Sequence, residues 1–249
     1  MAYKRQNGKR SSPMAYIPLA AVLVLIIVIF GVSVFFRVTV IEVTGGSRYT
    51  ADEIIAASGI QTGDNLFLIN SDAVWLRIKA SKPYISSVRI ERRIPDVAVI
   101  TVTESVAFAV LMQGNDCWII DSTGRILGRT DFAGTEGLIR VSGLSFVNPK
   151  EGAQVEVSDN YSTQLGYMLD IFKAIHDAGM SRDITNLDIT NISAISFVYK
   201  GGVNVRFGGG ENAAKKLERL ADALKDKPDD FRGQVLLDRD DQTSVLPAE

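Results

Sequence analysis

The longest hydrophobic run lies near the start of the chain. Residues 17–36, with the sequence IPLAAVLVLIIVIFGVSVFF, are uncharged and strongly apolar. A helix of this length spans about 30 Å, the thickness of the hydrocarbon core of a bilayer. Four basic residues and no acidic residue precede the run: Lys4, Arg5, Lys9 and Arg10. The pattern predicts a transmembrane helix over 17–36, a cytoplasmic basic tail over 1–16 and an exported remainder.

A cleaved signal peptide has a similar start and is the alternative reading of this segment. Gly31-Val32-Ser33 is a weak cleavage site of the small-x-small type. The apolar part of a signal peptide runs for only about 7–15 residues, however. Here it continues through Phe36, past the candidate site, which favours a retained anchor.

The segment after the anchor predicts a small α+β domain over residues 37–105. A strand is expected at 38–43, and Thr50 with Glu53 has the spacing of a helix capping box. That first helix should end at Gly59, and a second should run from Ser71 to Pro83.

Two further strands complete the first domain. Residues 85–93 alternate apolar and charged side chains, and residues 97–104 are rich in β-formers. The expected order is β-α-α-β-β, with two helices on a three-stranded sheet. Arg92 and Arg93 are read as part of an ordinary solvated face.

A second, mostly β domain is expected over residues 106–239. Apolar spacing of three and four residues predicts amphipathic helices over 161–175 and 213–224. The strands are expected at 108–112, 117–121, 125–127, 138–141, 187–189, 195–199, 203–207 and 235–238. Residues 240–249 contain too few apolar side chains to pack, so they are predicted to be a flexible acidic tail.

The charge balance excludes some classes of partner. The basic tail holds four of the 27 Lys and Arg residues and none of the 29 acidic ones, so the exported part is net negative. Nucleic-acid binding needs a concentrated basic surface, which this balance argues against.

No catalytic or metal-binding set is recognisable. His176 is the only histidine and follows the apolar spacing of its helix, so it is expected at the edge of a core. Cys117 is the only cysteine and is expected to be a small buried hydrophobe. We therefore predict a protein that binds other proteins, without enzymatic activity, a cofactor, a metal or a small-molecule substrate.

Two stretches of the first domain resemble a known family. Residues 82–96, KPYISSVRIERRIPD, followed by 99–104, VITVTE, are similar to a passage of the POTRA domain of the bacterial cell-division family FtsQ/DivIB. Residues 59–67, GIQTGDNLF, resemble its G-x-x-G-x-N-L-F loop. The second domain resembles the β domain of the family more loosely, at 187–189, 205–208 and 216–220.

The resemblance implies a function. It implies a non-enzymatic scaffold of the divisome, in the cytoplasmic membrane at the division septum. Its exported part would bind the ectodomains of the coiled-coil membrane proteins FtsL and FtsB/DivIC, and so help to control septal peptidoglycan synthesis. The alternatives are a POTRA-bearing translocation or envelope-assembly component, and a membrane-anchored wall hydrolase or transferase.

The resemblance also implies where the FtsB-type partner binds. Family members use their last β-domain strand and the helix before it. An unpaired strand edge can accept a peptide strand by β-augmentation. The corresponding residues of this chain are Val235, Leu236, Leu237, Asp238 and Arg239 on the strand, with Lys215, Lys216 and Arg219 as charge partners on the helix. The alternative is that 235–238 only closes the sheet.

Overall fold

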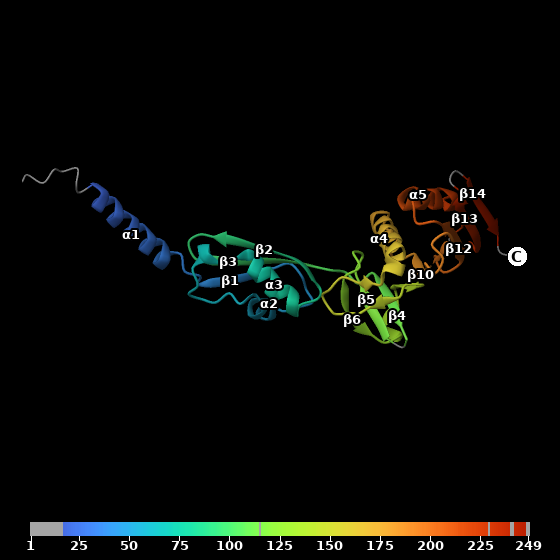
Figure 1. Cartoon of the computed structure of the whole chain (residues 1–249). Helices are drawn as coiled ribbons and strands as arrows, with labels where there is room; N and C mark the ends of the chain where they lie inside the picture. Colours follow the sequence, from blue (N-terminus) through green and yellow to red (C-terminus); the bar gives the residue numbers. More distant parts are fainter. Residues whose placement is uncertain (1–16, 115, 229, 240–241, 248–249) are drawn as a thin grey trace, which may run out of the picture. The chain divides into compact units, whose positions relative to one another are not determined.

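The computed structural model describes residues 17–114, 116–228, 230–239 and 242–247, so the predicted tail 1–16 lies outside it. The chain forms two compact units (Figure 1). The first contains residues up to Arg77 and Ser87–Val102; the second contains Ile78–Ser86 and the residues from Thr103 onward. Each is described by itself.

The first element is the apolar helix α1, Ile17–Phe35. It has 19 residues and none of them is buried. In the described part of the chain it is the one helix long and apolar enough to cross a membrane. The prediction of an apolar helix here is confirmed, with its end one residue earlier than expected.

A three-stranded sheet with two helices follows, in the order β-α-α-β-β that the sequence predicts. The elements are β1 (Val40–Thr44), α2 (Ala51–Ser58), the short 3-10 helix η2 (Leu66–Leu68), α3 (Ser71–Ser81), β2 (Ile85–Arg93) and β3 (Val97–Glu104). The strand order is β1-β3-β2, with β1 parallel to β3. Apolar residues of the helices and strands, such as Ile54, Ile78 and Ile100, form the core.

Local signals explain where these helices begin and end. The Thr50 side chain accepts from the Glu53 amide, and the Glu53 carboxylate accepts from the Thr50 amide, which confirms the capping box. Gly59 ends α2 with φ at 70°, a left-handed conformation that glycine adopts without strain.

The second unit is built on a nine-stranded sheet. Its strands are β4 (Ala109–Gln113), β5 (Asp116–Ile120), β6 (Ile126–Thr130), β7 (Ile139–Ser142), β10 (Ile184–Asp188), β11 (Ile195–Tyr199), β12 (Val203–Gly208), β13 (Gly233–Arg239) and β14 (Gln242–Pro247). They lie in the order β14-β13-β12-β11-β10-β7-β4-β5-β6. A separate pair of very short strands, β8 (Phe146–Val147) and β9 (Glu156–Val157), and two 3-10 turns, η3 (Ala133–Thr135) and η4 (Asp159–Tyr161), complete the unit.

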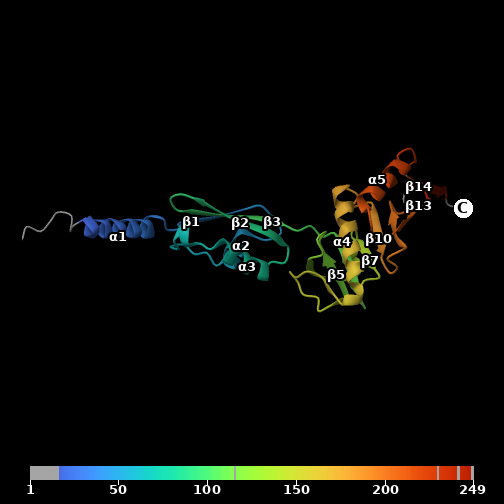
Figure 2. The same ribbon diagram turned by 45° about the horizontal axis from the view of Figure 1, so that its top comes forward.

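Two helices cross over between parallel strands of this sheet. Helix α4 (Ser162–Asp177) connects β7 to β10, and α5 (Ala213–Leu224) connects β12 to β13 (Figure 2). Parallel neighbours need such a crossover, and both helices pack their apolar faces on the sheet. Phe172 of α4, Leu217 of α5 and Phe207 of β12 belong to a single buried cluster. The predicted mostly β domain with two amphipathic helices is confirmed.

The prediction of an unpacked acidic tail is wrong for residues 242–247. These residues form β14, which pairs antiparallel with β13 so that Val245 lies opposite Val235. An edge strand needs only main-chain hydrogen bonds and a few inward side chains, and Val245 alone packs against the core cluster. A count of apolar residues was therefore the wrong criterion.

Candidate partner-binding surface

Strand β13 contributes more to the core than to the surface. Val235 and Leu237 are completely buried, while Leu236 on the opposite face is half-buried. The Asp238 carboxylate lies 3.4 Å from the Arg206 guanidinium on β12. Of the five strand residues predicted to bind a partner, two therefore have side chains that a partner cannot reach.

The expectation that β13 has an unpaired edge is wrong. Its residue Leu236 lies opposite Arg206 of β12 on one side and Ser244 of β14 on the other. With a neighbour on both sides, β13 cannot take up a further strand while β14 is in place. The edge of the sheet is β14.

The basic residues predicted on α5 are not equivalent. Lys215 is exposed, whereas Lys216 is only 6 % exposed. The Lys216 ammonium donates to the Gly209 carbonyl at 2.8 Å and lies 5.0 Å from the centre of the Phe207 ring. Because this ammonium is already held inside the unit, Lys216 is a structural residue and not an available charge partner. Lys216 comes three residues after Ala213 and four before Leu220, which places it on the apolar face of the helix, so its burial could have been predicted from the sequence.

Arg219 connects α5 to the edge strand. Its guanidinium donates to the Thr243 hydroxyl at 3.1 Å and to the main-chain carbonyl of Gln242. The structure thus brings one predicted residue, Arg219, against two residues that the sequence reasoning assigned to a tail. These bonds help to hold the start of β14 against the helix.

The outer edge of β14 has free pairing capacity. Along this strand, Thr243 and Val245 are half-buried, while Gln242, Ser244 and Leu246 are exposed on the other face. In an edge strand, every second residue directs its N–H and C=O groups away from the sheet. Pro247 ends the strand and has no N–H to offer. An extended peptide of about five residues can therefore add to this edge.

The opposite edge of the sheet is less accessible. The main chain of Ile126 on β6 accepts from Gly152 and donates to Ala153, so a loop already pairs with the start of this strand. Farther along β6, Arg129 forms an ion pair with Asp116 at 2.5 Å. Charged side chains and covering loops are common protections of sheet edges. Of the two edges, β14 is the better candidate for binding an added strand.

The start of α5 is fixed to α4 by a short hydrogen bond. The Tyr167 hydroxyl lies 2.5 Å from the Glu211 carboxylate. This bond lowers the pKa of Glu211 and raises the pKa of the Tyr167 hydroxyl, because it favours a charged carboxylate and a neutral phenol. Helix α5 is therefore held at its start by Glu211 and farther along by Arg219.

The described residues contain no candidate metal site. Among the described residues, no three His, Cys, Asp or Glu side chains gather as they would around a metal ion. Cys117 is buried, as predicted. The ring of His176, near the end of α4, lies 6.5 Å from the ring of the core residue Phe108 while its side chain stays 64 % exposed, which is the predicted place at the edge of a core.

The fold and this surface define a class of protein: its described part holds one helix long and apolar enough to span a membrane, a small α+β domain and a second domain that offers a sheet edge. Residues 36–105 match the POTRA domain of FtsQ type, and residues 109–240 match the C-terminal domain of cell division protein FtsQ/DivIB. The chain belongs to the FtsQ/DivIB family of cell division proteins.

Individual relatives agree with this assignment. The cell division protein DivIB of Clostridium tetani is 27 % identical over 80 % of this chain and 73 % of its own length. The cell division protein FtsQ of Corynebacterium glutamicum is 26 % identical over 82 % of this chain and 87 % of its own. The cell division protein FtsQ of Syntrophotalea carbinolica is 29 % identical over 77 % of this chain and 67 % of its own length. The similarity extends through both domains.

Proposed function

We propose that the chain is a non-enzymatic scaffold of the bacterial divisome. It binds the ectodomains of an FtsL-type and an FtsB/DivIC-type membrane protein and thereby helps to control septal peptidoglycan synthesis. Membership of the FtsQ/DivIB family supports the role in cell division.

We place the FtsB-type partner on the outer edge of β14. The observation that carries this proposal is that β14 ends the nine-stranded sheet beside α5, with Arg219 bonded to it. The partner adds as a further strand, so that main-chain hydrogen bonds supply affinity and the exposed side chains Gln242, Ser244 and Leu246 supply selectivity. Lys215 lies instead in a hollow beside α4 with Asp170 and Lys173, and Asp238 pairs with Arg206 of β12, so neither is part of the proposed site.

We further propose that the protein lies in the cytoplasmic membrane at the septum, with residues 37–105 as the POTRA domain and 106–239 as the core of the partner-binding domain. Its basic start remains in the cytoplasm, because short loops rich in Lys and Arg are retained there. A translocation or envelope-assembly component is the less favoured alternative, since both parts of the exported chain match the cell-division family.

A pull-down with the full chain in detergent tests the site. The baits are the FtsL-type and FtsB/DivIC-type proteins of the same organism. A variant truncated after Arg239 lacks β14, and Arg129→Ala at the opposite edge is the matched control. We expect the truncation to abolish binding of the FtsB-type protein, while Arg129→Ala binds normally.

Other outcomes separate the two parts of the proposal. A truncated protein that binds as well as the full chain would show that the partner uses β13 and that β14 only covers it. Absence of binding by the intact chain to both baits would contradict the scaffold function itself.

A further inference from the structure

The loop that precedes η2 is bonded directly to the end of the membrane helix. The Asn65 side chain donates to the Val32 carbonyl at 3.0 Å, and its own oxygen accepts from the Phe67 amide at 2.9 Å. The Leu66 amide donates to the Phe36 carbonyl at 2.8 Å. The last carbonyls of any α-helix have no partners inside the helix. The G-x-x-G-x-N-L-F motif supplies such partners and therefore caps the end of α1.

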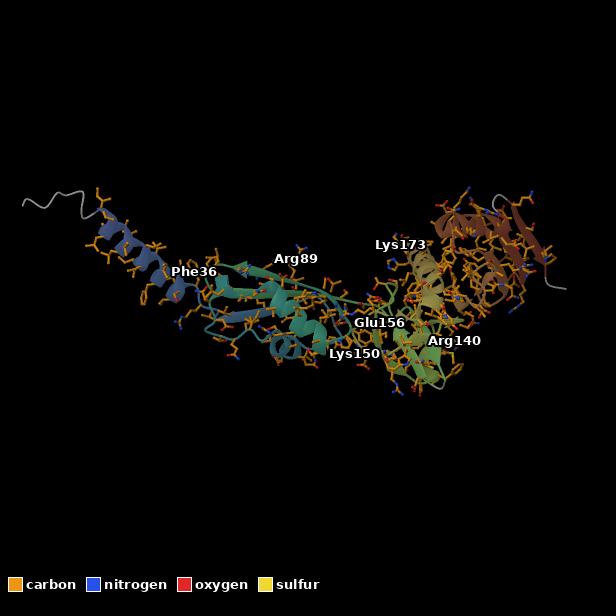
Figure 3. The ribbon with its side chains drawn as sticks, viewed as in Figure 1. Phe36, Arg89, Arg140, Lys150, Glu156 and Lys173 are labelled. Carbon is orange, nitrogen blue, oxygen red and sulfur yellow. The ribbon has the colours of Figure 1, made fainter. Side chains whose placement is uncertain are left out.

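The loop continues this contact on the other side of Phe36. Asp64 and Gly63 exchange main-chain hydrogen bonds of 2.8 Å with Val38. The rings of Phe36 and Phe67 lie edge to face with centroids 4.9 Å apart; Phe36 is labelled at the end of α1 in Figure 3. From the other side, the Arg92 guanidinium donates to the carbonyls of Leu66 and Ile69 at 2.9 and 2.8 Å. Arg92 is exposed, as predicted, and its guanidinium also holds this junction together.

The length of α1 sets the depth of the loop in the membrane. Its 19 residues span about 28 Å, close to the thickness of the hydrocarbon core, which is about 30 Å. Val32 lies in the last turn of the helix, so its carbonyl is close to the boundary between hydrocarbon and headgroups. A side chain bonded to that carbonyl must also lie at this boundary.

Large apolar side chains are exposed at this level. Phe67 is 47 % exposed and Leu68, which follows it on η2, is 81 % exposed. Ile94, 66 % exposed, lies in the turn between β2 and β3. That turn is bonded to the segment that directly follows the anchor, because the Thr39 amide donates to the Asp96 carbonyl at 2.9 Å. In water these side chains would be unfavourable, whereas the interfacial region of a bilayer accepts them.

We propose that Phe67, Leu68 and Ile94 form a membrane-contacting patch. The patch enters the headgroup region of the leaflet on the exported side and holds the POTRA domain at a fixed orientation to the bilayer. The occupant of the patch is lipid, because the hydrogen bonds between the loop and α1 place these residues where the membrane helix leaves the hydrocarbon. The inference rests on α1 spanning the membrane.

Depth-dependent fluorescence quenching tests the patch. In the full chain with Cys117→Ser, single cysteines are introduced as Leu68→Cys, Ile94→Cys, Leu76→Cys or Ile29→Cys and labelled with the NBD fluorophore. The proteins are reconstituted into vesicles of phosphatidylcholine and phosphatidylglycerol that contain doxyl-labelled lipid. Leu76 is the matched control because it is 64 % exposed on α3, outside the loops bonded to the anchor. Ile29 reports insertion of α1.

We expect labels at positions 68 and 94 to show blue-shifted emission and several-fold quenching, and the label at 76 to show neither. Labels at 68 and 94 that remain as unquenched as the label at 76, while the label at 29 is quenched, would overturn the patch and leave the anchor intact. An unquenched label at 29 would overturn both the spanning helix and the patch. All four introduced cysteines lie at exposed sites, so labelling does not require the core to rearrange.

Discussion

At the scale of single residues, burial separates two neighbouring lysines of α5. Lys216 is buried and its ammonium donates to the Gly209 carbonyl, while Lys215 faces solvent. Removing a buried hydrogen bond from a charged donor costs about 1–3 kcal/mol, because the carbonyl loses its partner as well. We expect Lys216→Ala to lower the free energy of unfolding by about this amount.

Lys215→Ala is the matched control, and its effect should stay within about 0.5 kcal/mol, as for most surface substitutions. Urea unfolding of the full chain in detergent, followed by circular dichroism, compares the two variants. Equal losses of stability would show that the buried ammonium contributes nothing specific.

These lysines also show what a single sequence can and cannot predict. The sequence locates α5 and its apolar face, because helical periodicity is visible in the chain itself. The hydrogen bond from the Lys216 ammonium to the Gly209 carbonyl depends on where the end of β12 lies relative to α5. That position is set by the tertiary structure and not by the local sequence. The hydrogen bonds of Arg92 were not predictable for the same reason, since its acceptors Leu66 and Ile69 belong to a distant loop.

At the scale of elements, Gly208 controls the approach of β13 to β12. Its φ is +78°, and a Cβ at this position would lie 2.8 Å from the Cα atom of Asp238. Gly137 also has a positive φ, +75°, but a Cβ there would meet no atom within 4 Å. Gly137→Ala should therefore cost only the backbone strain, about 1–2 kcal/mol.

Gly208→Ala should cost more, about 3 kcal/mol or above, because the backbone of β13 must also move. It should weaken binding of the FtsB-type partner too, since β14 is positioned by β13. Thermal unfolding and the pull-down described above measure both effects. Equal destabilisation by the two substitutions would contradict a steric role for Gly208.

The elements of this chain were largely predictable, and the exception is instructive. The capping box of Thr50 and Glu53, the ends of β2 and β3 and both amphipathic helices follow from local spacing. Strand β14 was missed because half of its residues are polar and its partner β13 supplies the pairing. The same error led to the choice of β13 as the sheet edge, since the identity of an edge strand depends on the whole order of the sheet.

At the scale of the whole molecule, orientation in the membrane follows from charge. The tail before α1 contains Lys4, Arg5, Lys9 and Arg10, and basic segments of this kind are retained in the cytoplasm. We expect alkaline phosphatase fused after Glu249 to be active in cells and a green fluorescent protein at the same place to be dark. If the green fluorescent protein fusion is fluorescent and the phosphatase fusion is inactive, the end of the chain lies in the cytoplasm and the proposed topology is wrong.

The position of β14 in the chain has a consequence for biogenesis. It follows every other strand of the sheet in the chain, so in the proposed topology it is the last strand to cross the membrane. The central strand β7 pairs in parallel with both β4 and β10, and such non-local pairing is slow to form. The partner-binding edge that we propose would therefore be complete only in a chain that has been exported through Pro247 and has closed its sheet. A chain stalled in the translocon would display its POTRA domain without this edge, and only finished molecules would recruit a partner there.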